Sequence, residues 1–589
     1  MYSDDRLVLQ LLSLMKQFGI RRVVISPGSR HYPLVHSMEN DDFFIMYSVV
    51  DERSAAFFAL GLIQQSGEPV AVCCTSGTSV VNYGSAVVEA YYQGLPLVVL
   101  SADRLPELLG QKEEQVFRQH DVYEGFIRYQ GQLKIVRDSL SEWYCNRVIN
   151  EAFLELDHHG RGPVHLNYPI ESHHLDRFQT PALPQARKIA RISADVEEAV
   201  WASYAARLEG KKVLIVWGQT NPMSDSLRAA LDLFAERFNC AILTDKLANC
   251  HHPRAVESAY LALHSMNDKQ MADLAPDIVI SLFGNYTFNG ELKGYLKFAG
   301  EQYECWDIGR SEVCDPFQRL TTIFEMNEAF FFRTLARHAG GAGSAAYFEG
   351  WSQVEATIVE PDVPFGEIYA IGKLMHSLPE GAALQIANSL PIRITHLFKS
   401  DPSIRSFCNR GVNGIDGCMS TAVGFAAATD EPVFLVIGDL TFFYDMNALW
   451  NRHLSPNLRI LLVNNQGGGV MHLPLADSLA PQLTRHVSAG HVTSGRGWAE
   501  SLGIRYYSAE TREETDAAIA LLTDPAEPGP IVIEVFSRKE DDVREFKKYL
   551  YKHKTYTFKE KVKGKLKRVK GRLERELPGV FRRFPPNVG

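Results

Sequence analysis

The sequence predicts an α/β protein of three doubly wound parallel-sheet domains, followed by a basic C-terminal tail. Three observations predict this fold class. The chain has 589 residues, which is more than a single hydrophobic core supports. Short apolar runs alternate with helical stretches, as in parallel strands joined by crossover helices. These runs end in small and polar residues, and open α/β sheets bind ligands at such strand ends.

We expect four segments along the chain. They are a first domain over residues 1–180, a middle Rossmann-like domain over 190–340, a third domain over 360–545 and the basic tail over 546–589. A polar, Pro-containing stretch near 175–190 and a run of small residues at 339–344 mark the two inner boundaries.

The composition is typical of a globular protein in a reducing compartment. Hydrophobic residues make up 46% of the chain and charged residues 22%, and no apolar run approaches the roughly 20 residues of a membrane span. Acidic residues precede the first apolar residues, so the N-terminus predicts an amphipathic helix and not a signal peptide. The nine cysteines lack zinc-finger spacing. We therefore expect reduced, buried thiols in a cytoplasmic protein.

In the first domain, three apolar runs predict strands. They lie at residues 22–25, 69–74 and 97–101, with helical stretches between them. Polar loops that contain Ser29, Arg30 and Thr75 to Gly77 follow the first two runs, and Arg104 follows the third. In the middle domain, the runs at 212–218 and 278–284 predict strands of a second α/β unit.

The third domain carries the strongest chemical signal. Gly438 and Asp439 follow the apolar run at 432–437, and Asn465 follows the next run at 458–463. A carboxylate and an amide at the ends of two strands could bridge one Mg²⁺ ion, which prefers oxygen ligands and also binds substrate phosphates. Three glycines at 467–469 allow the backbone to approach a phosphate closely.

This spacing resembles the signature of thiamine diphosphate (ThDP) enzymes of the decarboxylase type. The resemblance implies that Asp439, the side chain of Asn465 and the carbonyl of Gly467 hold Mg²⁺ or Mn²⁺, which in turn holds the cofactor's diphosphate. It also implies that Glu52 is the catalytic carboxylate that contacts and activates the aminopyrimidine ring. The first domain would then be the pyrimidine-binding domain and the third the diphosphate-binding domain. Further cofactor contacts implied are Thr75, Ser76, Gly77, Ser389, Ile415, Gly438, Gly467, Gly468 and Val470.

A set of short motifs in the same order narrows the resemblance. The stretches 26–30, 51–54, 75–78, 102–107, 388–389, 409–411 and 414–417 make the chain similar to the menaquinone-pathway family of 2-succinyl-5-enolpyruvyl-6-hydroxy-3-cyclohexene-1-carboxylate synthases. The family implies decarboxylation of 2-oxoglutarate and 1,4-addition of the succinyl carbanion to isochorismate. Both substrates are anions, which arginine binds in a bidentate way. The substrate contacts implied are Ser29, Arg30, Arg104, Gln115, Lys293, Ser389, Arg393 and Arg410.

Several positions depart from the family pattern, and they gather on the acceptor side. They are His31, Tyr32, Glu114, Glu291 and Met471. A related enzyme with a different acceptor therefore remains an alternative, in which His31 and His472 act as acid or base or are simply packed histidines. A non-catalytic scaffold that keeps the fold is a second alternative.

The resemblance and the tail give expectations about partners. In ThDP enzymes the cofactor lies between subunits, so we expect a homodimer or a dimer of dimers (a homotetramer). From Lys552 onward the chain has 13 Lys or Arg and three Glu, and Val562, Leu566, Val569 and Leu573 share one helical face. Such a tail could contact an anionic membrane surface weakly, or it is a solvated extension. We expect no nucleic-acid binding, because no known nucleic-acid module is present.

Overall fold

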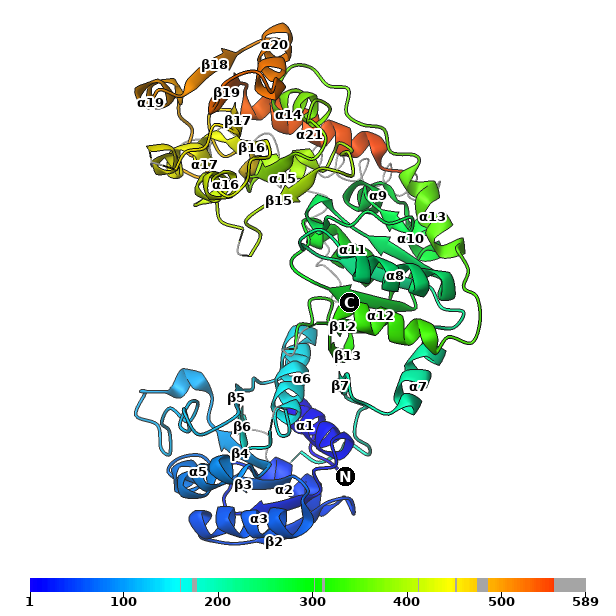
Figure 1. The fold of residues 1–589 in the computed structure, drawn as a ribbon. Coiled ribbons are helices and arrows are strands. Elements are labelled where there is room, and N and C mark those ends of the chain that lie inside the picture. Colours follow the sequence, from blue (N-terminus) through cyan, green and yellow to red (C-terminus); the bar gives the residue numbers. More distant parts are fainter. Residues whose placement is uncertain are drawn as a thin grey trace, which may run out of the picture. The chain divides into compact units, whose positions relative to one another are not determined.

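The computed structural model describes residues 1–158, 160–171, 177–300, 302–309, 313–411, 413–450, 453–473 and 486–555 (Figure 1). The chain forms two compact units. The first comprises Met1–Ala194 with Arg310–Glu325, and the second comprises Asp195–Gly309 with Met326–Gly589.

The first unit is built on a six-stranded sheet whose order is β2-β1-β3-β4-β6-β5, with all neighbours parallel. The strands are β1 (Arg22–Ile25), β2 (Ile45–Ser48), β3 (Val70–Cys74), β4 (Leu97–Asp103), β5 (Tyr129–Gln132) and β6 (Val164–Pro169). The helices are α1 (Arg6–Gln17), α2 (Tyr32–Glu39), α3 (Glu52–Ser66), α4 (Ser79–Asn82), α5 (Gly84–Gln93), η1 (Pro106–Leu108) and α6 (Ser139–Leu154). A parallel pair, β7 (Ala190–Ser193) and β13 (Leu320–Glu325), also belongs to this unit.

Helices cover both faces of this sheet, which explains why its central strands are apolar throughout. In β3, Ala71 and Cys73 join the core beneath α1 and α6, whereas Val72 and Cys74 join the core beneath α3 and α5. The expected N-terminal amphipathic helix is α1, and the carboxylate of Asp5 caps it by accepting hydrogen bonds from the first turn.

The second unit holds two further parallel sheets. In the middle one, five strands follow the order β10-β9-β8-β11-β12. Its strands are β8 (Val213–Trp217), β9 (Cys240–Leu243), β10 (Ala255–Val256), β11 (Ile278–Leu282) and β12 (Glu304–Ile308). Its helices are α7 (Glu198–Leu208), α8 (Asp225–Arg237), η3 (Lys246–Ala248), α9 (Ala259–Ser265), α10 (Asp268–Asp273), α11 (Asn289–Ala299), α12 (Glu328–Arg337) and α13 (Ala346–Glu355).

The last sheet has the order β15-β14-β16-β17-β19-β18, again with all neighbours parallel. Its strands are β14 (Ala383–Ile386), β15 (Arg405–Phe407), β16 (Val433–Gly438), β17 (Leu458–Asn464), β18 (Arg505–Ala509) and β19 (Ile531–Phe536). Its helices are α14 (Glu367–Met375), α15 (Leu390–Thr395), α16 (Cys418–Ala426), α17 (Asp439–Tyr444), η4 (Met446–Trp450), η5 (Gly469–His472), α19 (Arg496–Ser501), α20 (Arg512–Thr523) and α21 (Lys539–His553).

The predicted fold class is confirmed, since each predicted apolar run forms a strand of a parallel sheet. The predicted domain limits remain predictions, and the part of the tail beyond residue 555 lies outside the described residues. Eight cysteines are buried as expected, but Cys314, which lies in a loop, is exposed. Among the described helices, none is long and apolar enough to cross a membrane.

Candidate active site

Two strands of the third domain bring the predicted metal ligands together. β16 and β17 are parallel neighbours, and Gly438 pairs with Val463 at their carboxyl ends. Asp439 begins α17 directly after β16, and Asn465 follows β17. Both side chains are buried, with 3% and 5% of their surfaces exposed. The structure therefore places a carboxylate and an amide at one edge of the sheet.

The hydrogen bonds of these side chains leave one oxygen without a partner. Asp439 Oδ2 accepts from the Gly467 amide at 2.8 Å, and Asn465 Nδ2 donates to Glu367 at 2.9 Å. Asn465 Oδ1 is buried and accepts no hydrogen bond. A buried acceptor beside a carboxylate is costly unless a cation completes it. The residues therefore fit a hard divalent ion.

Two side chains at this edge were missed in the sequence. His491 Nε2 lies 3.1 Å from Asp439 Oδ2. Glu367 is buried and accepts from Asn465, and burial together with nearby Asp542 raises the pKa of its carboxyl well above the usual range. The available signal was an acid at the start of an otherwise apolar helix, α14.

The glycine loop has a conformation that other residues rarely adopt. Gly467 has φ of 144°, and a Cβ there would lie 2.7 Å from the carbonyl oxygen of Ser488. The Gly468 amide donates to the same carbonyl at 2.6 Å. Val470 lies in η5, directly after these glycines. The loop thus presents backbone beside Asp439, as a diphosphate site needs.

Three predicted substrate residues gather at the ends of β14 and β15. Ser389 has φ of 81° and precedes α15, and Arg393 Nη1 donates to its carbonyl at 2.8 Å. Arg410 is buried, donates through Nη1 to Asn388 Oδ1 at 2.9 Å, and leaves Nε without an acceptor. Burial lowers the pKa of Arg410, with Arg393 adding to the effect. A buried guanidinium with a free N–H is suited to an anionic ligand.

Helix α11 presents an acid where the family pattern has bases. Glu291 is half-buried, burial raises its pKa, and Arg393 acts in the opposite direction. Lys293 is exposed on the same helix, and its part in substrate binding remains a prediction. Ile415 is half-buried in the loop before α16.

The first unit has a second polar edge. The Arg30 amide, after β1, donates to Thr75 Oγ1, after β3, at 3.3 Å. Arg30 Nε and Ser76 Oγ are buried without partners, whereas Ser29 is exposed. Glu52 begins α3 after β2, with Asn82 Nδ2 3.5 Å from its carboxylate. These groups form the edge that the sequence predicted for a ligand.

Gln115 and Arg104 lie at the same edge. Gln115 has φ of 54° and packs against Gly77. Arg104 contacts two consecutive acidic residues, of which Glu114 departs from the family pattern. Its Nε donates to the carbonyl of Glu114 at 2.7 Å, and its Nη1 lies 3.5 Å from the carboxylate of Glu113. The sequence did not reveal a buried network beneath this edge. It joins Gln119, Asn167 and Asp103, and Gln119 also accepts from the Gly77 amide.

The remaining departures occupy different environments. His31 is buried with Nδ1 3.5 Å from Cys73 Sγ, and burial lowers its pKa to about 4, which describes a neutral packed histidine. His472 is buried with neither ring nitrogen hydrogen-bonded. Tyr32 packs its exposed ring on His36 and Phe178, and Met471 is exposed. His31 is therefore unsuited to acid–base catalysis.

Fold and site together define a thiamine diphosphate enzyme. Residues 6–122 match the N-terminal TPP-binding domain of thiamine pyrophosphate enzymes, and residues 391–535 match the C-terminal TPP-binding domain. These segments carry the polar edges described above.

Curated relatives narrow the class. A 2-succinyl-5-enolpyruvyl-6-hydroxy-3-cyclohexene-1-carboxylate synthase of Bacteroides thetaiotaomicron is 40% identical, over 94% of this chain and 100% of the relative. Proteins of the same name from Phocaeicola vulgatus and Porphyromonas gingivalis are 39% and 33% identical, over 94% and 88% of this chain and 99% and 92% of the relatives. The chain belongs to this synthase family, and it is a ThDP-dependent C–C bond-forming transferase.

Proposed function

We propose that the protein decarboxylates 2-oxoglutarate and adds the succinyl group to isochorismate in a 1,4 sense. The products are 2-succinyl-5-enolpyruvyl-6-hydroxy-3-cyclohexene-1-carboxylate and CO2, in menaquinone biosynthesis. The observation that carries the proposal is the unpartnered Asn465 Oδ1 beside Asp439 and Gly467, in a chain that matches the synthases over 94% of its length.

Different residues would bind the metal ion, hold the proton and position the cofactor. Asp439, Asn465 and the carbonyl of Gly467 would hold Mg²⁺ or Mn²⁺, and Glu52 would hold a proton at the pyrimidine ring. When bound, thiamine diphosphate supplies the carbanion-stabilising chemistry that side chains lack. The cofactor would be positioned by Thr75 to Gly77, by Ile415 and by the loop from Gly467 to Val470.

The arginines would bind the carboxylates of the two substrates. Arg393 and Arg410 lie near each other in the third domain, and burial of Arg410 strengthens its attraction for an anion. At the polar edge of the first unit, Arg30 and Arg104 would bind substrate together with Ser29 and Gln115. Ser389 would contact both cofactor and substrate. Its carbonyl accepts a hydrogen bond from Arg393 and so lies beside a proposed substrate-binding residue.

We further propose a homodimer or a dimer of dimers with sites between subunits. Exposed apolar side chains on and beside α3 to α5 support an interface there, namely Val50, Phe57, Phe58, Val81 and Tyr92. The third domain also exposes Tyr444 and Trp450, by 70% and 66%. We place the protein in the cytoplasm, with weak membrane contact through the basic tail and no role for nucleic acid.

A different acceptor is the second candidate function. The observation that favours it is Glu291, a half-buried acid that acts on Arg393, while Lys293 is exposed. An ionised acid at this position repels an anionic acceptor as well as the anionic 2-oxo acid.

The test is a coupled assay with purified protein, ThDP, Mg²⁺ and 2-oxoglutarate, with and without isochorismate. CO2 release and isochorismate absorbance are followed together. We expect both to change only when every component is present. CO2 release with isochorismate untouched would point to another acceptor. If neither changes, the proposed donor is wrong as well.

A further inference from the structure

The loops at the carboxyl edge of the middle sheet bind neither the cofactor nor a substrate in the proposed function. In this sheet β8 lies between β9 and β11, so the chain runs outward on one side from β8 to β9 and on the other from β11 to β12. Doubly wound sheets usually bind a ligand in the crevice at such a switch in strand order. Here the crevice lies between the loops that follow β8 and β11.

Backbone groups of the two loops meet at that crevice. Gly218 follows β8 and Gly284 lies just beyond β11, and a Cβ on Gly218 would lie 2.0 Å from the Gly284 carbonyl oxygen. The Gly284 amide also donates to the carbonyl of Gln219 at 3.1 Å. The two loops are therefore in direct backbone contact.

The same two loops instead bind the segment that carries Arg410. Gln219 Nε2 donates to the carbonyl of Cys408 at 2.7 Å. Asn285 Nδ2 donates to the carbonyl of Arg410 at 2.7 Å and to that of Gly411 at 3.1 Å. Three backbone carbonyls of the segment 408–411 thus accept hydrogen bonds from two side-chain amides of the middle domain.

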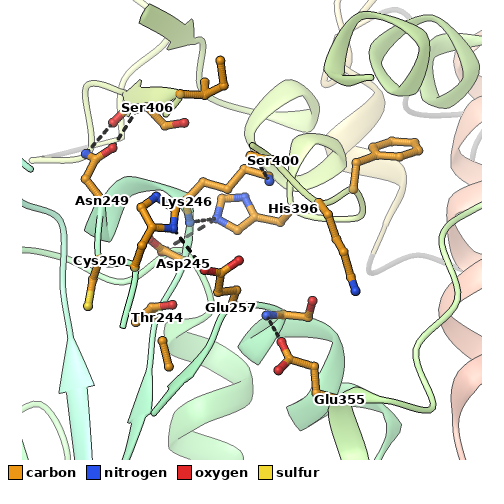
Figure 2. Close-up of a pocket in the computed structure, with 16 residues that line it drawn as sticks. Thr244, Asp245, Lys246, Asn249, Cys250, Glu257, Glu355, His396, Ser400 and Ser406 are labelled. Carbon is orange, nitrogen blue, oxygen red and sulfur yellow. Dashed lines mark hydrogen bonds and ion pairs between the residues drawn. The ribbon is translucent and has the colours of Figure 1, made fainter. Parts of the chain in front are cut away.

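A second set of contacts surrounds a cavity of about 200 Å³ beside this segment (Figure 2). Asn249 exchanges two hydrogen bonds with the backbone of Ser406, at 3.0 and 2.8 Å. The amide of Lys246 donates to His396, which ends α15 one turn after Arg393, and the Lys246 ammonium donates to Ser400. The middle edge therefore contacts both elements that carry third-domain arginines.

We propose that Asn285, assisted by Gln219, is a positioning residue that fixes the backbone of Arg410 and so aims its guanidinium at an anionic substrate. The inference rests on the proposed function, since it assigns Arg410 to substrate binding. Asn388 restrains only Nη1 of the guanidinium. The position of Nε therefore depends also on where the backbone of Arg410 lies, and small displacements of a binding group greatly weaken catalysis.

The experiment compares Asn285→Ala with Asn285→Asp in the full-length protein. Aspartate keeps the size of the side chain but loses the donor and repels both carbonyls. With one lost hydrogen-bond donor, we expect KM to rise roughly threefold to thirtyfold. The substrate affected should be the one whose KM rises in Arg410→Ala. We expect kcat, the affinities for ThDP and Mg²⁺, and the unfolding midpoint to stay near wild type. Asn221→Ala, an exposed asparagine of the same sheet edge, is the matched control.

A double-mutant cycle decides whether Asn285 acts through Arg410. In an Arg410→Ala background, Asn285→Ala should raise KM no further, because the group that it positions is absent. Additive effects, an unchanged KM, or a loss of ThDP affinity equal to the loss of activity would overturn the inference. Should Asn285→Ala fail to fold, Gln219→Ala undergoes the same cycle. Failure of the proposed function is a separate result, namely a wild-type protein that releases no CO2 from 2-oxoglutarate.

Discussion

Individual buried atoms without partners mark the two polar edges. They are Asn465 Oδ1 and Arg410 Nε in the second unit, and Ser76 Oγ and Arg30 Nε in the first. When no ligand supplies a hydrogen-bond partner, each such buried atom destabilises the folded protein by about 1–3 kcal/mol. All four belong to residues that the family resemblance assigns to cofactor or substrate, which is consistent with sites that ligands complete.

Glu291 should weaken binding of the 2-oxo acid. It acts on Arg393 and its pKa is raised by burial, so its charge appears only as pH rises through that raised value. We expect Glu291→Gln to lower KM for 2-oxoglutarate roughly twofold to tenfold, since one nearby charge is worth about 0.5–1.5 kcal/mol when partly screened. Steady-state kinetics over a pH series measure the effect, and the ratio of wild-type to variant KM should increase with pH as the carboxyl ionises.

Glu349 provides the control for this charge change. It is exposed on α13 in the same unit, and Glu349→Gln should leave KM unchanged at every pH. A Glu291→Gln enzyme whose KM equals that of wild type across the range would show that Arg393 does not receive the donor.

His31 should make the first unit less stable in acid. Burial lowers its pKa to about 4 in the folded protein, below the value of about 6.5 in an unfolded chain. The unfolded chain therefore binds the proton first, and stability is lost as pH falls from about 6.5 towards 4, by at most roughly 3 kcal/mol. Urea unfolding should show a weaker acid dependence for His31→Gln than for wild type. Equal slopes for His31→Gln and the half-exposed control His36→Gln would contradict this.

At the scale of elements, the site depends on turns that follow parallel strands. Gly467 is the clearest case, because its φ of 144° and the Ser488 carbonyl both exclude a side chain. An alanine there must shift the loop, at a cost of about 1–3 kcal/mol. We expect Gly467→Ala to weaken ThDP and Mg²⁺ binding roughly tenfold to a hundredfold, measured by calorimetry, while circular dichroism stays that of wild type.

The matched control is Gly497→Ala in α19. A Cβ at Gly497 meets no atom within 4 Å, and alanine favours a helix. Wild-type cofactor affinity in both variants would show that the glycine loop takes no part in the cofactor site.

At the scale of the whole molecule, the proposed assembly predicts complementation between two inactive chains. If Glu52 of one chain works with Asp439 of another, a mixed dimer of Glu52→Gln and Asp439→Ala chains has one site that carries neither change. Random mixing should then restore about a quarter of wild-type activity. Co-expression with two affinity tags isolates the mixed dimer, which should release CO2 at about half of the wild-type rate.

Mixed dimers of Asp439→Ala and Gly467→Ala chains are the control. Both changes lie in the third domain, so every site carries one of them, and activity should not exceed the mean of the two parent variants. If the Glu52→Gln and Asp439→Ala pair also stays inactive although tagged mixed dimers are recovered, each site belongs to a single chain.

Much of the candidate site could be predicted because its residues follow strands directly. Asp439 and Asn465 come after apolar runs, and parallel pairing brings the ends of those runs together. Glu367, His491 and Asn285 could not be found this way. Glu367 lies near Asn465 only through packing of α14, and His491 only through a loop that returns to β16.

The sequence by itself determined the α/β class, the parallel strands and the order of the polar loops, because apolar periodicity and strand-end residues are local properties of the chain. Tertiary structure alone decided that His31 is packed and neutral, that Glu291 acts on Arg393, and that Asn285 holds the backbone of Arg410. These outcomes depend on burial and on contacts between residues up to 125 positions apart. Local patterns encode which residues can form a strand or a turn, but not which neighbours surround them after the sheets have packed.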